Sequence, residues 1–357
     1  MKKKVSFPGL DKYHIPVSYL IKKTTDLEVV GPIPTTKKTL ELGSKYSPDM
    51  VCVPFKYNLG NFIEALDNKA DVLLQIGGGC RCGYYREVQE TILKDLGYKF
   101  SFYSIRENNT NGFKSMFKTF KKLNPNLSFL KFIHYLLVTL LMIYYMDNTD
   151  EYIRRNIGFE VDKNSFKNLN RKMLKSFTKC NNIFSLTYNY LKYKRMFKKI
   201  KINKPKNCLR VGIIGELYTS MEPFSNYFLE ETLASMNIEI KRYTNATYLL
   251  IKKMFCEAKM LRYVKKYIKY PIGADGLDNV YRAKKLIDKG YDGIIHIKPF
   301  GCTPEVSAIP IIKNVCNDYN MPIIFFSFDS ETSTALINTR LEAFYDMILM
   351  RKDGYNE

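Results

Sequence analysis

The stretch "ADVLLQIGGGCRCGYYREVQETILKDLG", Ala70–Gly97, decides the fold class. Its apolar start predicts a buried strand, and Gly77–Gly79 allow the chain to turn sharply after it. The following residues have the periodicity of an amphipathic helix, and Gly97 is a typical helix C-cap. A strand, a tight turn and a helix in this order form the repeating unit of α/β folds with parallel sheets.

The same alternation recurs on both sides of this stretch. We therefore predict an α/β fold with two Rossmann-like parallel-sheet lobes and a helical insertion. Expected boundaries are 1–111 for the N-terminal lobe, 112–206 for the helical segment with a basic linker, and 207–357 for the C-terminal lobe. The expected strands cover 27–33, 49–55, 70–79, 98–105, 208–218, 238–245, 291–302 and 321–329, and the expected helices cover 58–69, 84–97, 222–237, 280–290, 304–319 and a last one from Thr334.

The chain of 357 residues is strongly basic, with a formal net charge of +21. Such charge is typical of proteins that bind nucleic acid or an anionic membrane surface, but here it is spread along the chain. The densest block, Lys192–Lys206, is interpreted as the solvated end of a helix; a docking surface for an acidic partner or nucleic acid is the alternative. Because no nucleic-acid-binding motif accompanies the charge, no nucleic-acid partner is expected.

The segment Leu127–Met146 is nearly all apolar. Lys131 and His134 interrupt it, and the uncharged part that remains is shorter than the roughly 20 residues of a membrane-spanning helix. We predict a buried helix with His134 in the core, and no membrane association. Since the N-terminus lacks the pattern of a secretion signal, a cytoplasmic location is expected.

Four of the eight cysteines occur where predicted strands end, close to glycine or proline. They are Cys52, Cys80, Cys82 and Cys302. Ligands of open parallel sheets bind beyond the carboxyl ends of the strands, so these thiols are expected to converge in the cleft between the lobes. The other four cysteines are interpreted as small buried residues. They are Cys180, Cys208, Cys256 and Cys316.

Thiols beside a glycine-rich turn suit a thiolate-rich metal site. The backbone N–H groups of Gly78 and Gly79, with the start of the next helix, would stabilise negative sulfur. Zinc is the simplest competitor, but structural zinc sites usually draw on C-x-x-C pairs, which this chain lacks. A basic α/β protein whose cysteines bind zinc or nothing stays open as an alternative.

Five collinear segments resemble the 2-hydroxyacyl-CoA dehydratase D-component family, in particular its branch of activase-related proteins. The resemblance runs from about Thr35 to Met347 and implies an oxygen-sensitive [4Fe-4S] cluster held by Cys52, Cys80 and Cys302. Cys82 is a fourth ligand, a substitute for Cys80, or a buried thiol. A double cubane would need six thiolates, which the cysteine count permits. The segments are "CVPFKYNLGNFIEAL", "GGGCRCGYYREVQ", "GIIGELYTSMEPFSN", "GYDGIIHIKPFGCTPE" and "FDSETSTALINTRLEAF".

The resemblance also implies partners and a reaction class. A separate iron–sulfur ATPase of the actin and sugar-kinase type would donate a low-potential electron to the cluster, for reductive or radical chemistry on an acyl-CoA or another small molecule under anaerobic conditions. The activity would be that of a 2-hydroxyacyl-CoA dehydratase-like lyase or an ATP-dependent reductase component, with a second cluster subunit or a homodimer. A non-catalytic electron carrier or assembly factor, or a double-cubane reductase, is the alternative.

Polar residues beside the motifs complete the predicted site. Glu216 and Glu222 are expected where a strand meets a helix, in contact with substrate; for Glu222, a place in a helix N-terminus is the alternative. Arg81 and Lys298 would offset the negative charge of the cluster. "GGGCRCG" lacks the lysine and the serine or threonine of a phosphate-binding loop, so the chain resembles the electron acceptor rather than the ATPase.

Overall fold

The structure is a computed structural model, and it describes residues 2–31, 33–75, 84–105, 112–253 and 256–353. The chain divides into two units by its internal contacts. The N-terminal unit comprises Met1–Ile143 and Ser176–Thr187, and the C-terminal unit comprises Tyr144–Lys175 and Tyr188–Glu357. The three-part division expected from the sequence stays a prediction.

The N-terminal unit is built on a parallel sheet with strand order β2-β1-β3-β4. Successive residues of β3 point to opposite faces, where Leu73 joins one apolar cluster and Leu74 joins another. Helices α1, α5 and α6 contribute to the cluster of Leu74, and α3 and α4 to that of Leu73. The strands are β1 (Lys4–Ser6), β2 (Glu28–Val29), β3 (Val72–Gln75) and β4 (Ser101–Ser104), and the helices named so far are α1 (His14–Thr24), α3 (Val53–Asp67), α4 (Tyr85–Asp95), α5 (Gly112–Leu123) and α6 (Phe129–Asn156). Helix α2 (Lys37–Tyr46) packs on α3.

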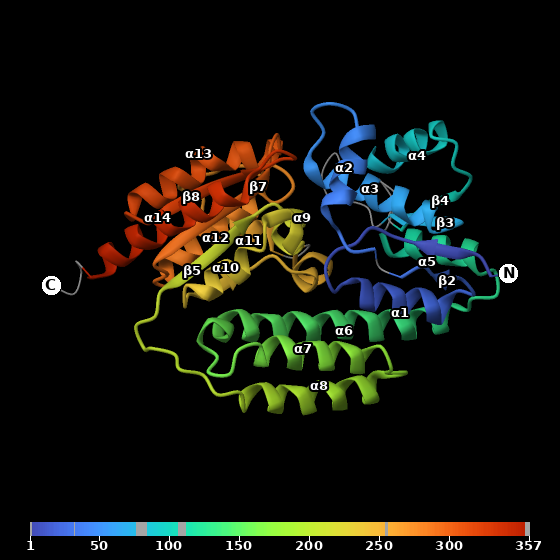
Figure 1. The fold of residues 1–357 in the computed structure, drawn as a ribbon, viewed down its shortest axis with the longest axis horizontal. Helices are drawn as coiled ribbons and strands as arrows, with labels where there is room; N and C mark the ends of the chain where they lie inside the picture. Colours follow the sequence, from blue (N-terminus) through green and yellow to red (C-terminus); the bar gives the residue numbers. More distant parts are fainter. Residues whose placement is uncertain (1, 32, 76–83, 106–111, 254–255, 354–357) are drawn as a thin grey trace. The chain divides into compact units, whose positions relative to one another are not determined.

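The C-terminal unit repeats this arrangement with a second parallel sheet of order β6-β5-β7-β8. Each sheet thus has its second strand at one edge and its first and third strands side by side. Helices α10 and α14 contribute to the apolar cluster on one face, and α11, α12 and α13 to that on the other (Figure 1). The strands are β5 (Arg210–Gly215), β6 (Glu239–Arg242), β7 (Gly293–Pro299) and β8 (Ile323–Phe328), and the helices are α9 (Leu217–Met221), α10 (Leu229–Ser235), α11 (Glu257–Tyr263), α12 (Gly276–Asp288), α13 (Thr303–Asp318) and α14 (Thr334–Asp353). Two parallel-sheet lobes are therefore confirmed.

The predicted helical segment contains α5, α6, α7 (Ser165–Phe177) and α8 (Ile183–Lys198). Residues 129–159 are long and apolar enough to cross a membrane by length and composition, and 39% of their most apolar window is buried in the protein. Core helices and membrane spans both meet this criterion, so the absence of membrane association stays a prediction. The core assignment of His134 is wrong, because its side chain is exposed beside the Tyr135 ring.

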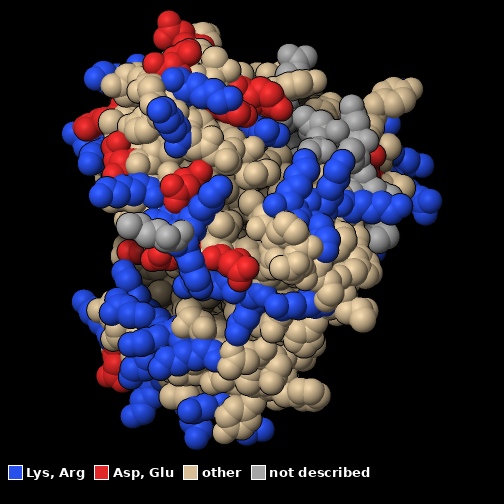
Figure 2. All heavy atoms as spheres, turned by 90° about the vertical axis from the view of Figure 1, so that its right-hand side faces the viewer, with Lys and Arg blue, Asp and Glu red and all other residues tan. Residues whose placement is uncertain are grey.

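On the face shown in Figure 2, the side chains of Lys and Arg cover a larger area than those of Asp and Glu. This agrees with the excess of 56 Lys and Arg over 35 Asp and Glu in the sequence. In the part of the block Lys192–Lys206 that belongs to α8, the charged residues are exposed, as expected for a solvated helix end.

Candidate metal-binding cysteines

Cys302 lies at the carboxyl edge of the second sheet, three residues after β7 ends. It is the N-cap residue of α13, with φ −67° and ψ 98°, and Pro304 occupies the first turn of the helix. Proline is favoured there because the first backbone N–H groups of a helix have no partner within it. The thiol is partly exposed and stands at a helix N-terminus, which favours negative charge.

Cys52 occupies the same position on a different helix. The predicted strand over 49–55 is wrong, because α3 already begins at Val53 and Cys52 is its N-cap residue. Pro54 lies in the first turn, so the apolar letters that favoured a strand belong to a buried helix start. Since α3 ends at Asp67 just before β3 begins, its first residue points toward the carboxyl edge of the first sheet. Both sites have the motif Cys-x-Pro, and its proline is the feature of the sequence that indicates a helix start directly after the cysteine.

The start of α13 is fixed by a buried polar network. Glu305 accepts hydrogen bonds from the Nδ2 of Asn279 at 2.9 Å on both oxygens, and its Oε2 lies 2.7 Å from Nε2 of His296. Glu305, Asn279 and His296 are fully enclosed. Asn279 also accepts a hydrogen bond from the backbone N–H of Gly215 at 3.1 Å. The network therefore ties the helix that carries Cys302 to strands β7 and β5.

Gly215 ends β5 at a point where the backbone comes too close to β7 for a side chain. Its φ is +143°, and an added Cβ would lie 1.8 Å from the carbonyl oxygen of Ile297. Glycine is therefore required at this crossing, which brings Glu216 directly after β5 and next to β7. The backbone N–H of Glu216 donates to the same Ile297 carbonyl at 3.0 Å.

Lys298 lies on β7 and is buried. Burial lowers the pKa of its ammonium, and the nearby Cys302 and Glu305 act in the opposite direction. The structure thus places a cation close to Cys302, as the sequence analysis expected for a residue that offsets negative charge. The role itself stays a prediction.

A different set of contacts surrounds Cys52. Its sulfur lies 2.7 Å from the hydroxyl oxygen of Tyr85 on α4. The Tyr85 ring packs edge-on against Phe55, with 4.9 Å between the ring centroids. Gln89, which is fully buried, donates from Nε2 to the Phe55 carbonyl at 3.3 Å and accepts from the Nε2 of Gln75 at 3.4 Å. Neutral amides therefore link the start of α3 to the end of β3.

Both candidate carboxylates cap short helices. Glu216 is the N-cap of α9 and accepts from the backbone N–H groups of Tyr218 at 3.0 Å and Thr219 at 2.8 Å, and from the Thr219 hydroxyl at 2.8 Å. Burial raises the pKa of Glu216 to about 7, although these hydrogen bonds act to lower it. Glu222 is buried and accepts from the Phe224 N–H at 3.4 Å. Contact of either residue with substrate stays a prediction.

Of the four cysteines that were expected to be buried, three are, and the expectation is wrong for Cys256. Cys180, Cys208 and Cys316 are buried, as predicted, whereas Cys256 is partly exposed. Burial raises the pKa of Cys316 to about 12 and also raises that of Cys208. A buried thiol that resists ionisation is a poor metal ligand, because metals bind the thiolate.

The donor chemistry at Cys52 and Cys302 fits a thiolate-bound metal group, since both sulfurs lie at helix N-termini. Within the described residues, no three or more His, Cys, Asp or Glu side chains gather closely enough to hold a metal ion. Cys52 and Cys302 belong to different units. The other predicted site residues lie outside the described ranges, and the complete ligand set stays a prediction. These are Gly78, Gly79, Cys80, Arg81 and Cys82.

Comparison with known proteins supports the family predicted from the motifs. The family profile described as "2-hydroxyglutaryl-CoA dehydratase, D-component" matches residues 156–348, more than half of the chain. The match includes Glu216, Lys298 and Cys302, and it begins after the segments around Cys52 and Cys80. A search of curated proteins found no match. The chain belongs to the 2-hydroxyglutaryl-CoA dehydratase D-component family.

Proposed function

We propose that this protein is the cluster-binding, electron-accepting component of a 2-hydroxyacyl-CoA dehydratase-like system. The observation that carries the proposal is the family match over residues 156–348, which includes Cys302 at the start of α13. Cys52, Cys80 and Cys302 would hold a [4Fe-4S] cluster. When bound, such a cluster supplies a one-electron redox centre with an iron site open to substrate.

The protein's own residues have separate tasks in this proposal. The helix starts at Cys52 and Cys302 hold each thiol where the backbone N–H groups favour negative sulfur. Lys298 offsets part of the negative charge from a buried position beside Cys302. Arg81, Gly78 and Gly79 would do the same around Cys80. An ATP-dependent iron–sulfur activator of the actin and sugar-kinase type would be the electron donor.

A second function is that of a non-catalytic electron carrier or assembly factor of such a system. The hydrogen bonds of Glu216 favour it, because three donors from its own helix start already account for this carboxylate. Oxidation of the pre-reduced protein upon addition of a 2-hydroxyacyl-CoA would exclude the carrier function. Unchanged reduction in the presence of several such substrates would support it.

The test is the iron and acid-labile sulfide content of protein purified without oxygen, for the wild type and for single alanine variants of Cys52, Cys80, Cys82 and Cys302. We expect about four irons per wild-type chain and loss of most of the iron in C52A, C80A and C302A. About eight irons would indicate a double cubane, and the result for C82A decides the role of that thiol.

Cys180→Ala is the matched control, because Cys180 is buried and lies away from the predicted ligand motifs. It should keep the wild-type iron content. A colourless wild-type protein with stoichiometric zinc, or full iron retention in C302A, would contradict the proposal.

A further inference from the structure

A cavity of about 430 Å³ lies within the C-terminal unit, between α6 and α8. Its lining follows one face of each helix. Residues 144, 148 and 152 are four apart on α6, and residues 190, 194 and 198 are four apart on α8. The lining residues are Tyr144, Asn148, Thr149, Tyr152, Tyr190, Lys194, Phe197 and Lys198. The size is within the range of sites for small organic molecules.

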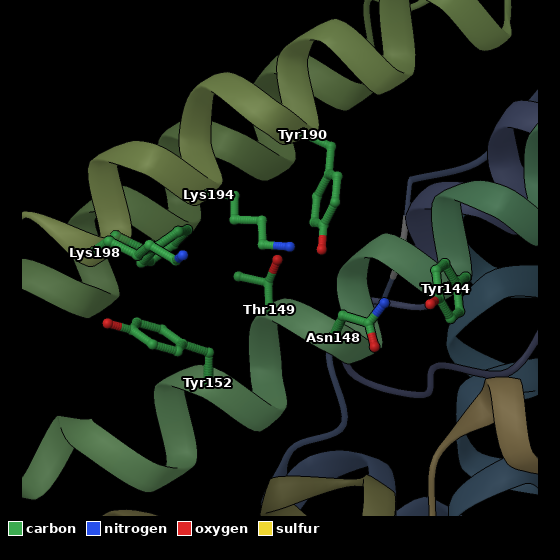
Figure 3. Close-up of a pocket in the computed structure, with 8 residues that line it drawn as sticks. Tyr144, Asn148, Thr149, Tyr152, Tyr190, Lys194 and Lys198 are labelled. Carbon is green, nitrogen blue, oxygen red and sulfur yellow. The ribbon is translucent and has the colours of Figure 1, made fainter.

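The cavity carries positive charge and no carboxylate in its lining. Figure 3 shows Lys194 extending from α8 toward α6, with Lys198 and Tyr152 at one end of the cavity and Tyr144 at the other. Among the residues that the structure describes, neither Lys194 nor Lys198 has an acidic partner within ion-pair distance. A helix C-terminus favours cations, which explains Lys198 in the last turn of α8 but not Lys194 one turn earlier.

The acidic residues of α6 are Asp147, Asp150 and Glu151, and none of them lines the cavity; Asp150 is buried. Asp147 accepts a hydrogen bond from the backbone N–H of Thr247 at 2.7 Å, and Glu151 pairs with Lys241 and Arg155. The positive charge of the cavity is therefore available to an external anion.

The aromatic part of the lining is held in a fixed position. Tyr190 stacks on Tyr145, with 3.9 Å between the ring centroids and 4° between the planes. The ammonium of Lys194 lies 5.6 Å from the centre of the Tyr190 ring. Phe197 is buried and packs at 6.2 Å from Phe166. These contacts pre-form one wall, so a ligand would not have to order it.

We propose that this cavity binds a small organic anion with a flat aromatic body. Lys194 and Lys198 would bind the acidic group, and the rings of Tyr144, Tyr152 and Tyr190 would contact the body. None of these residues is a candidate cluster ligand. Failure of this proposal is therefore distinguishable from failure of the proposed function.

Isothermal titration calorimetry of the full chain with 1-naphthoate tests the proposal. We expect one binding site for 1-naphthoate and at least about tenfold weaker binding of the neutral 1-naphthalenemethanol and of inorganic phosphate. Adenosine monophosphate is titrated in parallel. If the nucleotide binds more tightly, the natural ligand is a nucleotide; if 1-naphthoate binds more tightly, it is an aromatic carboxylic acid. The absence of binding by both would overturn the proposal.

Substitutions locate the binding site. The variant Lys194→Gln/Lys198→Gln should weaken binding of the better anion about tenfold, because two charge contacts are lost. The matched control, Lys192→Gln/Lys199→Gln, removes the same charge from exposed positions of α8 and its end that do not line the cavity. Its affinity should stay within about twofold of the wild type. Equal losses in both variants would show that general charge alone attracts the anion, and would overturn the proposal.

Discussion

The two units present a cysteine in the same way but anchor it differently. Cys52 and Cys302 are each the N-cap of a helix with proline in its first turn, at the carboxyl edge of a sheet with the same strand order. The start of α13 is held by a carboxylate and an imidazole, whereas the start of α3 is held by two amides. The same backbone arrangement, a cysteine N-cap followed by proline, is therefore stabilised by a different kind of polar contact in each unit.

The difference has energetic consequences. A buried carboxylate is costly to enclose, so the network around Glu305 is stable only while all its members are present. A buried amide such as Gln89 carries no charge. Its loss leaves only neutral groups without a hydrogen-bond partner, which costs less than leaving partners of a buried carboxylate unpaired. The C-terminal unit should accordingly be more sensitive to substitution at its cysteine-bearing helix.

The largest expected effect is that of Glu305→Ala. Removing the carboxylate leaves Asn279 and His296 buried without their partner, which should lower the free energy of unfolding of the C-terminal unit by about 3–5 kcal/mol. Gln89→Ala, the counterpart in the N-terminal unit, should cost about 1–3 kcal/mol. Urea unfolding followed by circular dichroism measures both variants against the wild type.

Glu305→Gln keeps the shape of the side chain and should lose less stability than Glu305→Ala. Equal losses for Glu305→Ala and Gln89→Ala would show that charge does not distinguish the two anchors. An effect of Glu305→Ala below about 1 kcal/mol would mean that water replaces the carboxylate.

The alternation of strands and helices was predictable because each element has its own hydrophobic period. The start of α3 was missed because "DMVCVPF" has the apolar, β-branched composition of a strand, and only Pro54 indicates a helix start. The expected helix over 222–237 is interrupted, since Tyr227 and Phe228 adopt left-handed conformations with φ of 56° and 57°. Aromatic residues rarely adopt this backbone, so their sequence gave no sign of the break.

The hydrogen bonds that hold the start of α13 could not be predicted from the sequence, for a different reason. Gly215 and Asn279 are 64 residues apart, and only the folded sheet brings them together. Cys302 was expected at the end of a strand, and it lies three residues after β7 ends. The partners of Glu305 could not be chosen among many polar residues without knowledge of how α12 and α13 pack.

The second expected effect is a pH dependence that comes from Glu216 in the C-terminal unit. Burial raises the pKa of this carboxyl from 4.5 to about 7 in the folded protein. The unfolded chain then loses its proton at lower pH than the folded chain does. The contribution of Glu216 to stability therefore falls as pH rises from about 4.5 to about 7, by up to about 3 kcal/mol.

Glu216→Gln should remove this dependence, because the amide does not titrate in that range. Urea midpoints of wild type and variant, measured between pH 4.5 and pH 8, should differ increasingly in favour of the variant as pH rises. A difference between wild type and Glu216→Gln that stays constant over this pH range would contradict the assignment.

The smallest expected effect concerns the Tyr85 hydroxyl beside Cys52. Tyr85→Phe keeps the ring that packs on Phe55 but removes the hydroxyl 2.7 Å from the sulfur. Stability should change by less than about 1 kcal/mol. A hydroxyl that donates to sulfur stabilises the thiolate, so alkylation of Cys52 by iodoacetamide in the metal-free protein should slow about fivefold, and that of Cys302 should not change.

Mass spectrometry of the alkylated peptides measures both rates in one sample. Tyr98→Phe is the matched control, because it removes a hydroxyl that donates to Asp67 at the far end of α3. It should leave both rates unchanged. Faster alkylation of Cys52 in Tyr85→Phe would show that the hydroxyl shields the sulfur instead of stabilising its charge. The two cysteines would then differ in accessibility, and the helix N-terminus would be their common source of thiolate stabilisation.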